Sequence, residues 1–288
     1  MADIHYLENP LETEELMEKL CPPVRNWFRD KFDDFTRPQK LAIPAIMDKE
    51  HLLLCSPTGS GKTLTAFLTV IDNLVRSALD GKLEKKVHCV YISPIKALAN
   101  DIQRNLIGPL KEISDNYLPD RAQEIKVGLR TGDTPQNERQ KMLRNPPHIL
   151  ITTPESLAIA ITSPRFQPIV NAVEFMIIDE LHSLVPSKRG VHLALTLSYL
   201  DTLLTIPVQR IGISATMEPL ETVAEYLVSS GGDEDGPGTK VNIAKISGAR
   251  ELDLDILITD PKFSDLSVMK ILDKNIEAIA DLISAHTD

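Results

Sequence analysis

Short hydrophobic runs alternate with longer amphipathic stretches over most of the chain. The stretches between the runs keep a single apolar stripe, as at Leu64, Phe67, Leu68 and Ile71, which predicts helices. Runs that are hydrophobic throughout are typical of parallel strands, because helices cover both faces of a parallel sheet. The alternation therefore predicts an α/β fold with a mainly parallel sheet. The runs cover Leu52–Cys55, Val87–Ser93, Ile125–Leu129, His148–Thr152, Phe175–Ile178 and Arg210–Ser214.

A glycine-rich segment interrupts this alternation. The stretch "SSGGDEDGPG", Ser229–Gly238, cannot pack and predicts an exposed loop. Beyond it, the runs "VNIAKIS" and "LDLDILI" predict further strands, and Leu272, Ile276, Ile279 and Ile283 share one face of a final helix. The pattern predicts one sheet-containing domain followed by a tail.

Composition and charge limit the kinds of partner. A chain of 288 residues, 42% of them hydrophobic, can bury a substantial core. The 31 Lys and Arg against 41 Asp and Glu give a net charge of −10, so any contact with nucleic acid must be local. Cys21, Cys55 and Cys89 lie at no metal-ligand spacing and predict reduced thiols. With neither a membrane-length apolar run nor a signal peptide in the sequence, we expect a cytoplasmic protein without membrane contact.

The segment "SPTGSGKT" stands between a predicted strand and a predicted helix. A glycine-rich turn there can bind phosphate through its backbone N–H groups and the helix N-terminus. Lys62 can reach the β- and γ-phosphates, and the Thr63 hydroxyl can bind magnesium. A solvent loop that contains Gly-Lys-Thr by chance is the alternative, and Ser56 departs from the strict pattern, which has glycine there. The predicted phosphate loop comprises Ser56, Pro57, Thr58, Gly59, Ser60, Gly61, Lys62 and Thr63.

The stretch "FMIIDELH" ends a predicted strand with two acidic residues. Ligands of open α/β sheets bind at the carboxyl ends of strands. Asp179 can hold Mg²⁺, and Glu180 can polarise the water that attacks the γ-phosphate. The alternative is an ordinary acidic turn, and His182 by itself would more often be a packed or surface histidine.

Two shorter patterns leave their roles open. In "ISAT", the hydroxyls of Ser214 and Thr216 could bond to Asp179 or His182 and report the nucleotide state, or could simply end a strand. In "FTRPQ", the amide of Gln39 carries the donor and acceptor needed to recognise an adenine edge. The same residue also completes a capping box with the threonine three residues before it, which needs no nucleotide.

Taken in order, "FTRPQ", "SPTGSGKT", "SPIKAL", "TGD", "TTPESL", "DELH" and "SAT" resemble the motifs of superfamily 2 helicases. The segments "ISPIKALANDIQRNLIGPLKEI" and "IIDELHSLVPSKRGVHLALTLSYL" are similar to the Lhr-like (large helicase-related) DExH-box family, particularly at Arg189-Gly190. The resemblance covers roughly Trp27 to Ile258. It implies a RecA-like three-layer sandwich, the first of two motor domains, which binds ATP and Mg²⁺.

The resemblance also assigns roles to residues at matching positions. It implies that Gln39 recognises adenine, that Thr63 and Asp179 hold magnesium, and that Glu180 activates water. It implies that His182, Ser214 and Thr216 couple hydrolysis to movement. Contacts with the sugar–phosphate backbone are expected at Pro94, Lys96, Thr131, Gly132, Thr153 and Ser156.

The same resemblance defines the expected domains and partners. Residues 1–240 are expected to form the ATP-binding domain, and residues 241–288 its last strands and a connection toward a second RecA-like domain. The expected partner is single-stranded or partly duplex nucleic acid, with DNA and 3′→5′ movement favoured over RNA. A non-catalytic module that has lost hydrolysis, or a kinase or transporter ATPase, remains an alternative, although neither of the last two explains "DELH" or "SAT".

Overall fold

The computed structural model describes residues 2–57, 59–94, 102–120, 122–228, 239–246 and 268–285. It divides into two compact units, Met1–Gly248 and Ala249–Asp288. The second unit contributes helix α13 (Val268–Ala285), where the sequence predicted an amphipathic helix. The predicted loop Ser229–Gly238 and the strand predicted from "LDLDILI" lie outside the described residues.

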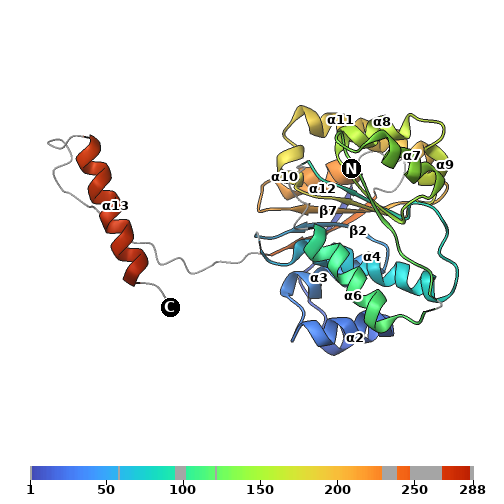
Figure 1. Cartoon of the computed structure of the whole chain (residues 1–288), viewed down its shortest axis with the longest axis horizontal. Coiled ribbons are helices and arrows are strands. Elements are labelled where there is room, and N and C mark those ends of the chain that lie inside the picture. Colours follow the sequence, from blue (N-terminus) through green and yellow to red (C-terminus); the bar gives the residue numbers. More distant parts are fainter. Residues whose placement is uncertain are drawn as a thin grey trace. The chain divides into compact units, whose positions relative to one another are not determined.

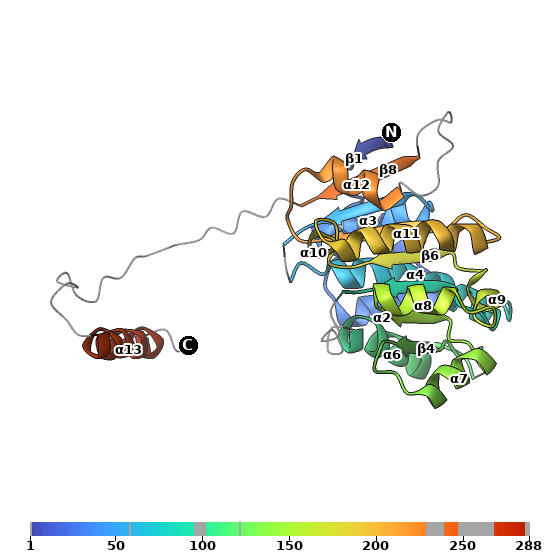
Figure 2. The ribbon, with the colours of Figure 1, turned by 90° about the horizontal axis from the view of Figure 1, so that it is seen from above.

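The first unit is built on an eight-stranded sheet in which every strand pair is parallel. The strand order is β1-β8-β2-β7-β6-β3-β5-β4, with β1 and β4 at the edges (Figure 2). This confirms the predicted α/β fold. The strands are β1 (Asp3–Tyr6), β2 (His51–Cys55), β3 (Cys89–Ile92), β4 (Val127–Arg130), β5 (Ile149–Thr152), β6 (Phe175–Ile178), β7 (Gln209–Ser214) and β8 (Lys240–Lys245).

Helices cover both faces of this sheet and complete three layers (Figure 1). One face carries α1 (Thr13–Lys19), α2 (Pro22–Lys31), α3 (Arg37–Met47), α4 (Lys62–Leu79), the π-helix η1 (Gln103–Ile107) and α6 (Gly108–Tyr117). The other carries α8 (Pro154–Ile161), α9 (Gln167–Val170), α10 (Leu181–Leu184), α11 (Lys188–Leu203) and α12 (Leu220–Val228). Helix α7 (Gln136–Arg144) lies near the edge strand β4.

The two hydrophobic cores explain why the strands are hydrophobic throughout. In β2, Leu52 and Leu54 pack into one core, whereas Leu53 and Cys55 pack into the other. Successive side chains of a strand point to opposite faces, so a strand covered on both faces needs apolar residues at every position. The hydrophobic pattern did not predict strand β1, because this strand is short, polar and largely exposed at the edge of the sheet.

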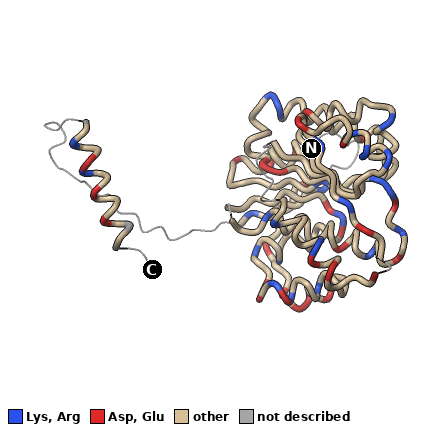
Figure 3. Tube along the Cα trace, viewed as in Figure 1, with Lys and Arg blue, Asp and Glu red and all other residues tan. Residues whose placement is uncertain are grey.

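Strand β8 extends the sheet beyond the predicted domain boundary at residue 240. It pairs with both β1 and β2, so the compact unit continues to Gly248. Figure 3 shows Lys and Arg interspersed with Asp and Glu along the trace of the first unit. Among the described residues, no helix is long and apolar enough to cross a membrane.

Candidate active site

The phosphate loop connects the end of β2 to the first turn of α4, as predicted. Gly59 and Gly61 have φ angles of 78° and 86°, in the left-handed region that favours glycine. Helix α4 begins at Lys62 directly after Gly61, so its free N–H groups start within the loop. This backbone is suited to binding an anion.

Ser56, the departure from the strict pattern, is fully buried and takes part in the loop's own bonding. Its Oγ lies 2.6 Å from the Oγ of Ser60, which donates its proton to the carbonyl of Pro57 at 2.8 Å. Because Ser60 has one proton, Ser56 is the donor between the two hydroxyls. The backbone N–H of Ser56 also donates to the carbonyl of Ser214 on β7, at 3.2 Å. The Ser56 hydroxyl therefore closes the loop through its bond to Ser60, which a glycine at this position could not make.

The ammonium group of Lys62 is held at the same loop. It donates to the carbonyls of Ser56 at 2.6 Å and Pro57 at 2.9 Å. The side chain thus folds back over the turn that is expected to hold phosphates.

Asp179 and Glu180 follow β6, which is separated from β2 by β7 in the sheet. Asp179 is buried, with 4% exposure; its carboxylate accepts bonds from the Glu180 N–H at 2.8 Å and from the Tyr91 hydroxyl. Glu180 has a φ of 53°, an unusual conformation for a residue with a side chain. Such backbone strain concentrates at functional sites, where the surroundings hold it in place.

His182 connects the acidic segment to β7. Its Nε2 lies 3.2 Å from Oε2 of Glu180, and its Nδ1 accepts a bond from the backbone N–H of Ala215 at 3.3 Å. The expected link between "DELH" and "SAT" therefore exists, but a backbone amide makes it. The Ser214 hydroxyl, for which a bond to Asp179 or His182 was one of two possibilities, donates to the sulfur of Met217 at 3.1 Å. Thr216 is exposed.

Gln39 takes part in the capping box and also lies at the phosphate loop. Its Oε1 accepts from the Thr36 N–H at 2.8 Å, and the Thr36 side chain caps α3 in return. A Cβ added at Gly61 would lie 3.7 Å from Nε2 of Gln39. The box thus holds the amide beside the loop, so capping and nucleotide contact do not exclude each other.

One cavity of about 960 Å³ brings most of these residues together. Thr58 lies outside the described residues. The aromatic side chains Trp27 and Phe32 and the π-helix residues Gln103 and Arg104 also line this cavity, although no sequence motif pointed to them. The predicted residues in its lining are Gln39, Gly59, Ser60, Gly61, Lys62, Thr63, Asp179 and Glu180.

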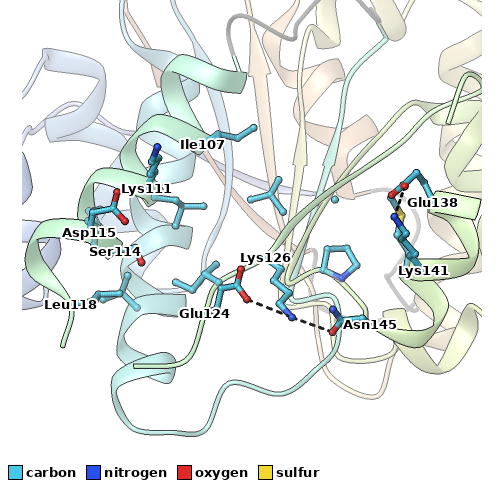
Figure 4. Close-up of a pocket in the computed structure, with 18 residues that line it drawn as sticks. Ile107, Lys111, Ser114, Asp115, Leu118, Glu124, Lys126, Glu138, Lys141 and Asn145 are labelled. Carbon is cyan, nitrogen blue, oxygen red and sulfur yellow. Dashed lines mark hydrogen bonds and ion pairs between the residues drawn. The ribbon is translucent and has the colours of Figure 1, made fainter. Parts of the chain in front are cut away.

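A second hollow, of about 540 Å³, lies between α6, β4 and α7 (Figure 4). None of the predicted site residues lines it. Four of its polar residues bond within its own walls: Lys126 donates to Asn145 at 3.3 Å, and Lys141 to Glu138 at 2.8 Å. It is separate from the candidate active site.

The expected nucleic-acid residues lie at the carboxyl ends of another set of strands. Pro94 follows β3, Thr131 and Gly132 follow β4, and Thr153 follows β5, and these three strands are neighbours in the sheet. Thr153 caps α8 by accepting from the Ser156 N–H at 3.4 Å, and donates to the Ser156 hydroxyl at 3.1 Å. Lys96 lies outside the described residues.

We call the ends of β2, β6 and β7 the nucleotide region, and the ends of β3, β4 and β5 the loop region. Residues 36–225 match the family model for DEAD/DEAH box helicases. The chain belongs to the DEAD/DEAH box helicase family. This match spans both regions, from Thr36 of the capping box to a position beyond "SAT".

Within this family, the chain is similar to Lhr proteins, as predicted. It is 47% identical over 235 residues to the ATP-dependent helicase Lhr-Core of Methanocaldococcus jannaschii, covering 81% of this chain and 28% of the relative. It is 46% identical over 241 residues to the Lhr helicase/uracil glycosylase of Escherichia coli, covering 82% and 15%. The structure of Mycobacterium smegmatis helicase Lhr bound to ssDNA and AMP-PNP matches with a TM-score of 0.77 and 40% identity, covering 94% and 33%. The chain thus spans about a third or less of the length of these proteins.

The helicase site contains oxygen ligands of the kind that magnesium prefers. The Thr63 side chain and the Asp179 carboxylate line the same cavity, and Mg²⁺ commonly completes its shell with water and substrate phosphates. No group of three or more His, Cys, Asp or Glu side chains that could hold a metal ion by themselves occurs within the described ranges. The donor set therefore fits a magnesium ion that completes its shell with water and nucleotide phosphates.

Proposed function

We propose that this chain is the ATP-binding motor domain of an ATP-dependent nucleic-acid helicase, and that it acts together with a second RecA-like domain. The observation that carries the proposal is the single cavity that joins Gln39, the phosphate loop, Asp179 and Glu180. The ssDNA bound to the similar Mycobacterium smegmatis helicase Lhr supports DNA as the strand, and 3′→5′ is the direction that the resemblance to the Lhr-like family implies. The buried, unpaired thiols of Cys21, Cys55 and Cys89 support a reducing, cytoplasmic location.

The residues in and around the nucleotide region have distinct parts in hydrolysis. The loop N–H groups and Lys62 bind the phosphates, and Gln39 contacts the adenine. Thr63 and Asp179 would hold Mg²⁺, and the ion would supply positive charge to offset the negative charge developing on the phosphates. Tyr91 and the Glu180 N–H fix the Asp179 carboxylate in place. Glu180 accepts a proton from the attacking water, and His182 keeps Glu180 in contact with the Ala215 backbone.

The test is the exchange Glu180→Gln in the full-length protein. The amide keeps the size of the side chain but cannot accept the proton, so ATP hydrolysis should fall by at least about 100-fold, as is typical for loss of a general base. ATP affinity should remain, because Lys62 and the loop are intact. Steady-state ATPase and binding of a fluorescent ATP analogue measure the two effects.

Glu18→Gln on α1 is the matched control, because Glu18 is exposed and lies outside the cavity. Unchanged hydrolysis in Glu180→Gln would exclude the role assigned to Glu180, whereas a wild-type protein that hydrolyses no ATP would indicate a non-catalytic module. Comparing stimulation by single-stranded DNA and by RNA of the same sequence identifies the natural strand. A kinase or a transporter ATPase would respond to neither.

The 288-residue chain alone should bind ATP weakly, hydrolyse it poorly and separate no strands. Family motors complete the site with arginines from a second RecA-like domain, and such residues contribute ~10³–10⁵ in rate. Strand separation by this polypeptide alone, measured with a fluorescent duplex, would contradict the expectation.

A further inference from the structure

Arg189 lies on the first turn of α11 and contacts two segments of the loop region at once. Its Nε donates to Oε1 of Glu155 at 2.6 Å, and its Nη2 donates to Oε2 at 3.2 Å. Its Nη1 donates to the carbonyl of Pro94 at 3.1 Å. All three guanidinium nitrogens are therefore engaged. A two-point bond to a carboxylate fixes direction as well as distance.

The chain that follows the acidic motif sets the position of Arg189. The Ser187 side chain caps α11 by accepting from the Gly190 N–H at 3.3 Å. A Cβ at Gly190 would lie 2.2 Å from the carbonyl oxygen of Leu184, so only glycine lets this turn pack on α10. Because α10 begins directly after Glu180, the arginine has a fixed place relative to the nucleotide region.

Arg189 connects the Pro94 segment to the first turn of α8. Glu155 lies in this turn, between the capping Thr153 and Ser156. The Arg189 contacts therefore tie the end of β3 to the start of α8, the two segments in which Pro94, Thr153 and Ser156 are expected to contact nucleic acid. A sugar–phosphate backbone can contact both segments only when their spacing is maintained.

The ion pair between Arg189 and Glu155 also neutralises a negative charge in the loop region. Glu155 stands in a loop region that is expected to face phosphates, where an unpaired carboxylate would repel them. The hydrogen bond from Arg189 lowers the pKa of the Glu155 carboxyl, so the glutamate is ionised and paired. About half of each side chain is exposed, 45% for Arg189 and 50% for Glu155, so the pair adds little to overall stability.

We propose that Arg189 is a positioning residue for nucleic-acid binding, which holds the Pro94 segment against the first turn of α8 while it neutralises Glu155. The inference rests on the proposed function, since it concerns the strand that the loop region is expected to contact. The competing role is direct: Arg189 could leave Glu155 and bind a phosphate itself.

The experiment compares Arg189→Ala, Glu155→Ala and the double variant in the full-length protein. Anisotropy of a labelled oligothymidylate gives the dissociation constant for DNA. Each single variant should weaken binding about tenfold, and the double variant should weaken it no further. All three remove the same connection, and the effects of substitutions at residues in contact do not add. Arg189→Lys keeps the charge but loses the two-point bond, so it should fall between Arg189→Ala and the wild type.

The control is Lys188→Ala, which removes a neighbouring exposed cation that has no partner in the described part of the chain. It should leave DNA binding within about twofold of wild type, as expected for a surface residue without contacts. ATP affinity and the melting temperature should stay unchanged in all variants, which separates positioning from a general loss of structure.

The outcomes separate the two roles and the two proposals. If Arg189 bound phosphate directly, Glu155→Ala would tighten DNA binding, and the double variant would lower the slope of log Kd against log salt by about one. That result, or wild-type binding in every variant, would overturn the positioning role while the proposed function stood. If the wild-type protein bound no DNA or RNA and showed no stimulated ATPase, the proposed function itself would fail.

Discussion

The nucleotide region and the loop region share one edge of the sheet but are held together differently. In the nucleotide region, buried groups bond to one another across short distances within the site, as Ser56 does to Ser60 and Asp179 to the Glu180 N–H and the Tyr91 hydroxyl. In the loop region, arginines from helices hold backbone carbonyls. Arg189 reaches Pro94, and Arg139 on α7 reaches the carbonyls of Thr131 and Gly132 at 3.2 and 3.0 Å.

This difference suggests which activity a substitution in each region should affect. Bonds between buried neighbours preorganise the nucleotide region for chemistry, where small displacements affect the rate strongly. In the loop region, arginine side chains that hold exposed loops set the spacing of the residues expected to contact nucleic acid. Substitutions in the first region should therefore act on ATP turnover, and substitutions in the second on nucleic-acid affinity.

The largest expected effect in this comparison concerns the link from Glu180 to β7. His182→Ala removes the contact between Glu180 and the Ala215 N–H. We expect stimulation of ATPase by oligothymidylate to fall about tenfold, within the usual range for coupling between sites. Basal hydrolysis should change by less than about threefold, because the histidine holds neither phosphate nor metal. Steady-state rates with and without DNA measure both.

His192→Ala is the matched control, since His192 is an exposed histidine on α11. An equal loss of basal and stimulated rates in His182→Ala would assign the histidine to hydrolysis itself. The coupling between DNA binding and ATP hydrolysis would then have to depend on another contact.

The sequence predicted the central strands and the phosphate loop because their signals are local. A run of apolar residues reports burial on both faces, and Gly59, Gly61 and Lys62 act through the backbone of one turn. Contacts between distant segments were harder to predict. Tyr91 looks like any buried strand residue, yet its hydroxyl donates to Asp179, 88 positions away.

In the loop region, too, contacts between distant segments could not be predicted from the sequence. The motif residues Thr153 and Pro94 could be recognised from sequence, but the arginine that joins their two segments through Glu155 could not. Arg189 was noticed only as part of a family pattern, because nothing in the sequence relates it to Glu155, 34 positions earlier. The sequence left two roles open for the Ser214 hydroxyl, and neither of them included the sulfur of Met217, to which the hydroxyl donates.

A smaller effect is expected when the cap of α8 is removed. Thr153→Ala leaves the Ser156 N–H without its acceptor, so the free energy of unfolding should fall by about 1 kcal/mol. DNA affinity should fall a few fold because the first turn loosens, whereas ATP affinity should be unchanged. Urea denaturation and anisotropy measure these effects, with Thr162→Ala at the exposed end of α8 as control. A comparable loss of ATP affinity would show that the two regions are not independent.

The smallest expected effect tests whether Ser56 contributes more than a small side chain. Ser56→Gly and Ser56→Ala both lose the bond to Ser60, and only glycine also adds backbone freedom. We expect ATP affinity to fall roughly threefold in both, consistent with one neutral hydrogen bond of about 0.5–1.5 kcal/mol. A fluorescent ATP analogue measures the change, and DNA affinity without nucleotide should stay constant. If Ser56→Ala bound ATP as the wild type does and only Ser56→Gly were weaker, backbone stiffness would explain the serine. The hydroxyl bond within the nucleotide region would then be incidental.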